Sequence, residues 1–364
     1  MKKQETINSW QTASLFLAFM TGSAIINIPA PLTGAAKNGA WLSLLIANGI
    51  GFLLLACVLY LHRQYPGLTF IDYSRKTLGS WLTVVIAVPF LSTVFLMLSN
   101  IVLDIGGFFT STMMKETPLY VFNSLILMTA ALTARAGIEV MARMFTLLLY
   151  IMVTLVFAVL LFVLPYYRPE HLLPVFPKGI KPILHGAYMA WGFPYAELIL
   201  FSMILPFTSK ERKSPLVKFM FLAHLVNGVS LVTVIVCTIM AIGPLAGEIK
   251  YSVFQLARLI NVQEIIERIE SVIGFTLIAG SYMKATIVLF ILNLALSQLL
   301  KLQDDRLLIF PVALVSLLLS LTMFKNEAEF VENVTVVWPL LITTVGVLPV
   351  LLITVVTLFK KNRK

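Results

Sequence analysis

Residues Thr6–Ala36 decide the class of this protein, since the stretch TINSWQTASLFLAFMTGSAIINIPAPLTGAA contains no Asp, Glu, Lys or Arg. A helix needs about 20 mostly apolar residues to cross a bilayer, and this run is longer than that. Gly22 and Pro29 lie inside it, and both residue types weaken a helix. The stretch therefore predicts a membrane-spanning helix that is interrupted near its centre.

Nine further segments of the chain have the same apolar character, and two of them carry one embedded charge. They are Asn38–His62, Thr77–Leu103, Thr117–Ala134, Met144–Tyr167, Pro182–Ser209 around Glu197, Phe219–Gly247, Ser271–Leu300 around Lys284, Leu307–Phe324 and Asn333–Phe359. Only 12% of all residues are charged, against about 25% in soluble domains. The segments do not alternate apolar and polar residues as barrel strands do. We predict an all-α membrane protein of about ten transmembrane helices.

The net charge of +10 reflects membrane orientation. With the N-terminus placed in the cytoplasm, 17 of the 27 Lys and Arg residues fall in cytoplasmic segments, 9 fall in the opposite loops, and Lys284 is embedded. An excess of basic residues on one side marks the cytoplasmic face of membrane proteins. The distribution predicts a multi-pass integral membrane protein with both termini in the cytoplasm, and it argues against a nucleic-acid partner.

The ten expected spans divide into two sets of five within one membrane domain that covers residues 1–364. Because five is odd, the second set starts on the opposite side of the membrane, so two halves of one fold must be inverted repeats. The first span of each half is interrupted at a corresponding place, by Gly22 with Pro29 and by Gly192 with Pro194. We place repeat one at about 9–164 and repeat two at about 183–359.

The two interruptions predict a binding site. A proline removes a helix hydrogen bond, and freed backbone groups are tolerated in a membrane only inside protein or beside a cavity. The half-helix that starts near Ile25 also directs its positive dipole end towards the gap. The expected substrate-binding residues are Thr21, Gly22, Ser23, Ala24, Ile25, Gly192 and Phe193. The alternative interpretation is a pair of packing kinks.

Glu197 and Lys284 are the charges expected deep in the membrane, where each costs roughly 2.5–3.5 kcal/mol on insertion scales. A functional interpretation is ligand contact, ion substitution or a proton relay; the alternative is a structural pair. We interpret Lys284 as taking the place of a bound cation between the first and eighth spans, with Glu197 as its counter-charge. Asp104 is interpreted as a structural residue near the end of its span.

Two segments outside the spans invite local predictions. Glu139 and Arg143 are four residues apart, which predicts a helix-surface ion pair, with a role in gating as the alternative. Val253, Leu256, Ala257 and Ile260 recur at three- and four-residue spacing. This spacing is typical of a short amphipathic helix, and an ordinary ordered loop is the other possibility.

Enzyme signatures are absent from the sequence. It contains no HExxH, Walker A, GxSxG or dinucleotide-binding pattern, and its four histidines do not make a metal-binding spacing. We predict that the chain is not an enzyme, that it uses no cofactor, and that it holds no metal.

Several local patterns together resemble the B subunits of spore germinant receptors, the endospore germination permeases of the amino acid–polyamine–organocation transporter superfamily. The matches cover nearly the whole chain. They are Gly22 with Pro29, Phe193-Pro194-Tyr195-Ala196-Glu197, Glu267-Arg268 with Glu270, Lys284, and the segment Arg135–Arg143. The chain departs from the family pattern at Ala24, where a second glycine is common.

The resemblance implies a LeuT-like fold of five plus five helices with the first and sixth broken. It also implies a subunit that senses a nutrient in the inner membrane of a spore and works with an A-type membrane subunit and a C-type lipoprotein. An amino acid is the favoured ligand, while sugars and purine nucleosides remain open. The alternative function is an ion-coupled secondary amino-acid transporter.

Overall fold

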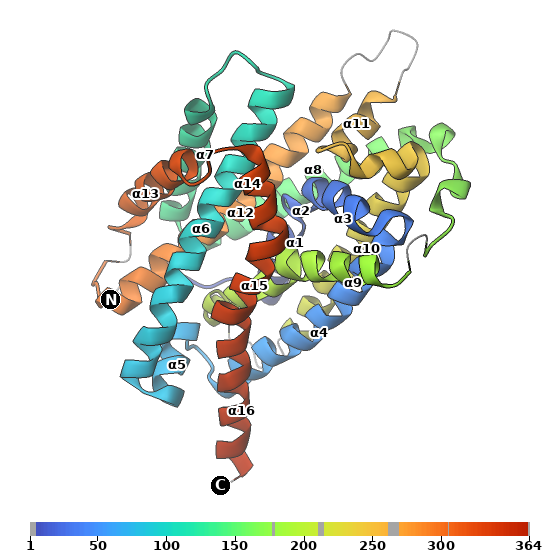
Figure 1. The fold of residues 1–364 in the computed structure, drawn as a ribbon. Coiled ribbons are helices and arrows are strands. Elements are labelled where there is room, and N and C mark those ends of the chain that lie inside the picture. Colours follow the sequence, from blue (N-terminus) through green and yellow to red (C-terminus); the bar gives the residue numbers. More distant parts are fainter. Residues whose placement is uncertain (1–4, 177–178, 210–214, 261–268, 305, 363–364) are drawn as a thin grey trace.

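A computed structural model of the chain describes all residues except 1–4, 177–178, 210–214, 261–268, 305 and 363–364 (Figure 1). The described residues are almost entirely helical. The first half contains α1 (Ser9–Thr21), α2 (Ala24–Asn27), α3 (Pro29–Ala36), η1 (Lys37–Gly39), α4 (Ala40–Gln64), α5 (Phe70–Leu78), α6 (Ser80–Thr112), α7 (Leu119–Ala136), α8 (Ile138–Phe162), η2 (Leu164–Tyr166) and η3 (Pro169–Leu172).

The second half repeats this alternation of long helices and short turns. It contains α9 (Lys181–Ala190), η4 (Trp191–Tyr195), η5 (Ala196–Met203), η6 (Leu205–Phe207), α10 (Leu216–Ile242), η7 (Gly243–Gly247), α11 (Ser252–Arg258), α12 (Glu270–Leu300), α13 (Ile309–Thr322), α14 (Glu327–Glu332), η8 (Asn333–Val337), α15 (Trp338–Ile342), η9 (Thr343–Val347) and α16 (Leu348–Asn362).

Seven helical segments of the described chain are long and apolar enough to cross a membrane. The other expected spans are interrupted or short. The first is α1 with α2 and α3, the sixth is α9 with η4 and η5, and the ninth is α13, which has 14 residues. The ten expected spans therefore all correspond to helical segments, and the first and sixth are broken as predicted.

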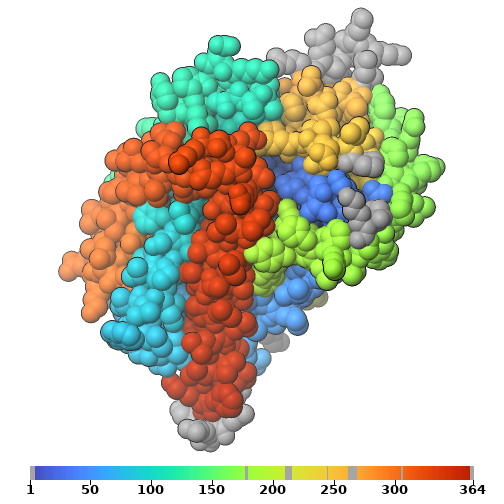
Figure 2. Space-filling model, in the orientation of Figure 1, coloured from blue at the N-terminus to red at the C-terminus, as the bar shows by residue number. Residues whose placement is uncertain are grey.

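Helix α12 forms the centre of the bundle. In its most apolar window 78% of the residues are buried, against 28–50% in the other six candidate spans. It packs against α1, α6, α7 and α8. Figure 2 shows that the C-terminal span, α14 to α16, lies on the surface between α6 and α9. The embedded charge of α12 therefore lies in protein rather than in lipid.

Two local predictions can be compared with the structure. Helix α8 begins at Ile138 rather than near Met144, because Gly137 (φ 101°) allows the chain to turn sharply after α7. Residues Val253 to Ala257 do form a short helix, α11, but Val253, Leu256 and Ala257 are buried against the protein. This apolar face packs on the bundle.

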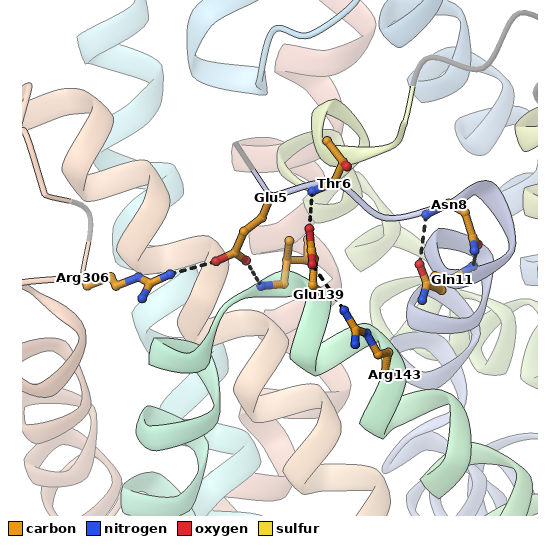
Figure 3. A network of polar contacts seen from close by, with 8 residues as sticks. Glu5, Thr6, Asn8, Gln11, Glu139, Arg143 and Arg306 are labelled. Atoms are coloured by element: carbon orange, nitrogen blue, oxygen red, sulfur yellow. Dashed lines mark hydrogen bonds and ion pairs between the residues drawn. The ribbon is translucent and has the colours of Figure 1, made fainter. Parts of the chain in front are cut away.

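The N-terminal segment before α1 is tied to three other parts of the chain, and Figure 3 shows its contacts with Arg306 and with the start of α8. The Glu5 carboxylate accepts hydrogen bonds from Arg306 Nη2 at 2.8 Å and from the Ile138 backbone N–H at 2.7 Å. The Ile7 N–H donates to the carbonyl of Phe207 at 2.9 Å. Segments that the charge pattern assigns to one side of the membrane thus lie together at one end of the bundle.

The predicted ion pair on α8 is present, and it is exposed. Arg143 Nη2 lies 3.4 Å from Glu139 Oε2, and the other oxygen of Glu139 accepts from the Thr6 N–H at 3.0 Å (Figure 3). An exposed pair of this kind stabilises a protein by at most about 1 kcal/mol. Its geometry fits the local structural interpretation, and the gating role stays a prediction.

The interruption in the first span contacts α12 through two glycines. A Cβ on Gly280 would lie 2.5 Å from the Gly22 carbonyl oxygen, and a Cβ on Gly22 would lie 2.9 Å from the Gly280 carbonyl oxygen. Backbone atoms cannot move aside as a flexible side chain can. Glycine at both positions is therefore what allows α12 to touch the interruption in the first span.

We expect Gly280→Ala to lower the thermal stability of the purified full-length chain, because overpacking typically costs about 1–3 kcal/mol. Gly107→Ala is the matched control, since a Cβ at Gly107 meets no atom within 4 Å and alanine favours a helix over glycine by up to about 1 kcal/mol. Thermal unfolding in one detergent measures both. Equal stability of the two variants would contradict the close contact between α1 and α12.

Candidate functional site between the broken helices

The first interruption lies between α1 and α2. Gly22 has φ −4° and ψ −110°, and its N–H still bonds to the Ala18 carbonyl at 2.9 Å. The chain becomes helical again at Ala24 and continues through Ile28 into α3, although Pro29 has no N–H to donate. The interruption is therefore only two residues long, Gly22 and Ser23.

The second interruption lies in η4. Phe193 has extended backbone angles, φ −140° and ψ 117°, and it is followed by a cis peptide bond to Pro194. A Cβ on Gly192 would overlap Pro339 of α15. The close contact with α15 and the extended Phe193 turn the chain, so that the Phe193 ring faces the same interior space as the first interruption.

A buried ion pair connects the interrupted sixth span to α12. Lys284 Nζ lies 2.6 Å from Glu197 Oε2, and both side chains are almost fully buried. The Lys284 ammonium also lies over two rings, 4.0 Å from the centroid of Phe193 and 5.0 Å from that of Phe19. Cation–π contacts of this kind add to the attraction when the cation is desolvated.

Glu197 has a second partner. Trp338 Nε1 of α15 donates a hydrogen bond to Glu197 Oε1 at 2.9 Å. Each carboxylate oxygen thus has its own donor, as a charge in a low-dielectric interior requires. The group of Glu197, Lys284, Trp338 and the Phe193 ring holds the sixth, eighth and tenth spans together, and Phe19 extends it to the first.

A cavity of about 120 Å³ lies next to this group. Its polar lining residues are Ser23, Asn27, Asn100, Asp104, Glu197, Lys250, Tyr251 and Thr335, and its apolar lining residues include Met97, Ile101, Phe193, Phe330, Val331, Val334 and Trp338. A dry cavity of roughly 150 Å³ can hold one benzene-sized molecule. The mixed lining is that of a site for one small molecule that carries at least one polar group.

The seven expected substrate-binding residues take different positions. Ser23 and Phe193 line the cavity. Gly22 and Gly192 pack against Gly280 and Pro339, and Thr21 is buried and accepts a hydrogen bond from Asn227 Nδ2 at 3.1 Å. Ala24 and Ile25 are buried in the core. All seven lie in or beside the two interruptions, and their role in binding stays a prediction.

The cavity contains polar residues that the sequence analysis did not select. Asp104, interpreted as structural, lines the cavity and accepts a hydrogen bond from Asn27 Nδ2. Asn100 precedes it by one turn on α6. The four-residue spacing of Asn100 and Asp104 places them on one helix face, and this was a usable signal, but nothing in the sequence shows that this face meets the first span.

Two further ion pairs involve the segment after η7, and one of them includes Lys250, which lines the cavity. Lys250 Nζ is 2.7 Å from Glu327 Oε1 of α14, and Lys37 Nζ is 3.4 Å from Glu248 Oε1. They link the segment between η7 and α11 to the tenth and first spans. Glu267 and Arg268, which are part of the family resemblance, lie outside the described residues.

We expect Lys284→Met to destabilise the protein by about 3–5 kcal/mol, because it leaves the buried Glu197 carboxylate without its cation. The double variant Glu197→Gln/Lys284→Met should recover most of this loss, since both charges are then removed. Thermal unfolding of the four proteins of this cycle gives the coupling between the two sites.

The matched control is Glu139→Gln/Arg143→Met on the surface of α8, where the same cycle should show a coupling below about 1 kcal/mol. A coupling at Glu197 and Lys284 that is no larger than this would contradict a buried ion pair.

The fold is shared with solved membrane transporters. The crystal structure of MhsT in complex with L-phenylalanine matches with a TM-score of 0.69 and 12% identity, covering 98% of this chain and 99% of that one. A Na⁺-coupled sialic acid symporter in a substrate-bound outward-open state matches with a TM-score of 0.68 and 9% identity, covering 94% and 79%. At these identities the comparison shows the LeuT-like fold of an integral membrane protein.

Sequence relatives cover nearly the whole chain. Spore germination protein KB of Bacillus subtilis (strain 168) is 26% identical over 355 residues, which are 96% of this chain and 94% of that protein. Spore germination protein YndE of the same organism is 25% identical over 98% of both chains. The family described as "Spore germination protein" matches residues 6–328, and the chain therefore belongs to this family of membrane-embedded spore germination proteins.

Proposed function

We propose that this chain is the nutrient-sensing subunit of a spore germinant receptor and that its ligand binds in the cavity between the two interruptions. The observation that carries this proposal is the contact between the cavity and the group around Glu197 and Lys284. A ligand can shift a conformational equilibrium only by contacting the two states differently. Spans one, six, eight and ten all meet at this group, so a ligand here would affect their relative positions.

The ligand that we favour is an amino acid. MhsT, which shares the fold, was solved with L-phenylalanine, and the cavity combines charged, amide and hydroxyl groups with apolar walls. In this proposal the chain lies in the inner membrane of the spore with both termini in the cytoplasm. The partners are an A-type membrane subunit and a C-type lipoprotein, which receive the conformational change through the helices and short loops of this chain.

A second function is supported by the fold itself. The solved proteins that share it include a Na⁺-coupled symporter and a manganese transporter, so an ion-coupled secondary amino-acid transporter is the alternative. Reconstitution of the purified chain in liposomes with labelled L-alanine or L-phenylalanine separates the two. Saturable accumulation driven by an ion gradient, without partner subunits, would establish transport, whereas sensing requires only binding.

The sensing proposal is tested by filling the cavity. Deletion of the gene identifies the germination response that depends on this chain. We expect Val334→Phe to abolish the same response, because Val334 lines the cavity and the added ring occupies the ligand's space. Val336→Phe is the control, since Val336 lies two residues further on the same span and is 48% exposed. Germination of spores that contain equal amounts of each variant is the measurement. A normal response of Val334→Phe spores would contradict the proposal.

We further propose that the Lys284 ammonium takes the place of a bound cation between the first and eighth spans. Its contacts with Glu197, Phe193 and Phe19 support this, as does its position beside the Gly22–Gly280 contact. Ligand binding by the unaltered chain should then be the same in sodium and in choline buffers. Binding that requires sodium would overturn this role for Lys284.

A further inference from the structure

The charges around the cavity do not balance. Lys284 is paired with Glu197 at 2.6 Å, and Lys250 is paired with Glu327 at 2.7 Å. Asp104 is the remaining carboxylate. Within the described part of the chain it has one hydrogen-bond partner, the neutral Asn27 side chain, and no ion pair. Asp104 thus faces the cavity with no cation of the described chain within ion-pair distance, and Lys250 and Lys284 attract it only from further away.

A second hydrogen-bond acceptor lies beside this carboxylate. Asn100 is one helical turn before Asp104 on α6, and its side chain lines the same cavity. Its Oδ1 atom is buried and has no hydrogen-bond partner among the described residues. The Asp104 carboxylate can only accept hydrogen bonds, and Asn27 donates to one of its two oxygens. Its other oxygen and Asn100 Oδ1 can therefore accept from a donor in the cavity.

The apolar surroundings of Asp104 and Asn100 make an unpaired acceptor costly. Met97, Ile101, Val331 and Val334 form apolar walls around the two acceptors. A charge in such surroundings is costly unless it is paired and hydrogen-bonded. An ammonium group has three N–H donors and one positive charge, and it can satisfy Asp104 and Asn100 together. A sugar or a purine nucleoside has donors but lacks the compensating charge.

We propose that Asp104 and Asn100 bind the protonated amine of the ligand, whose apolar part lies against the walls formed by α6, α14 and η8. The inference rests on the proposed function, because it concerns the same cavity, and it assigns the ligand class: small molecules with a protonated aliphatic amine. Asn27 is a positioning residue in this arrangement, since its side chain orients the Asp104 carboxylate.

The test measures ligand binding to the purified full-length chain in lipid nanodiscs. Binding is detected as a ligand-dependent shift in the thermal unfolding temperature. The probes are L-leucine, L-alanine, isoamylamine, isocaproate, glucose and inosine. Isoamylamine keeps the amine of leucine without its carboxylate, and isocaproate keeps the carboxylate without the amine. At least one amine-bearing probe should bind, and isocaproate, glucose and inosine should not.

The variants are Asp104→Asn, Asp104→Glu and Asn100→Leu. Loss of a charged hydrogen bond corresponds to a weakening of roughly 10- to 100-fold, so Asp104→Asn should weaken amine binding by that factor and Asp104→Glu should weaken it less. Asn100→Leu supplies an independent test if Asp104→Asn fails to fold. Asp304→Asn, the same chemical change in the loop after α12, should bind like the unaltered chain.

The inference is overturned if no amine-bearing probe binds, if glucose, inosine or sodium chloride produces the shift instead, or if Asp104→Asn and Asn100→Leu bind amines normally. The proposed function fails separately, when deletion of the gene leaves every nutrient response of the spores unchanged. Binding of isoamylamine by the chain together with an unchanged spore response would thus support the amine site and refute the sensing role.

Discussion

The buried ion pair between Glu197 and Lys284 is the interaction on which the rest of the structure depends. Each charge costs several kcal/mol to remove from water, and the pair is tolerated only because its geometry and additional hydrogen bonds offset that cost. The 2.6 Å contact, the Trp338 hydrogen bond and the Phe193 ring supply these conditions. The pair therefore requires the sixth span to be open at Phe193, the tenth span to lie beside it, and α12 to remain in the centre of the bundle.

The interruptions are sites of tight packing as well as sites of open backbone. Gly22 touches Gly280, and Gly192 touches Pro339, so close that neither glycine can accept a side chain without a shift of its neighbours. The cavity therefore lies against Ser23 and Phe193, on the side of Asp104 and Trp338, and not in the positions of the two packed glycines. A ligand in that space would contact the sides of the half-helices. Those helices are already held by the Gly22–Gly280 and Gly192–Pro339 contacts.

The two ends of the bundle differ in how they are held. At one end the segment before α1 is bonded to Arg306, Ile138 and Phe207 through Glu5 and Ile7. At the other end the cavity is lined by Lys250, whose partner Glu327 is more than half exposed. The first end combines the Glu5–Arg306 ion pair with backbone hydrogen bonds of Ile7. The Lys250–Glu327 pair at the second end joins side chains only, and exposed ion pairs are weak in water. Because Lys250 lines the cavity at the second end, access to the cavity is expected from there.

The sequence by itself determined the membrane class, the ten helical segments and the two interruptions, because charge-free length and the chemistry of glycine and proline are local properties of the chain. It also selected Glu197 and Lys284, since an embedded charge is costly wherever it lies. Only the tertiary structure decided that these two charges touch, that Trp338 joins them, and that Asp104 and Asn100 face a cavity rather than packed protein. Those facts depend on which helix faces meet across the bundle, and the residues involved are separated by scores of positions along the chain, so no local pattern encodes them.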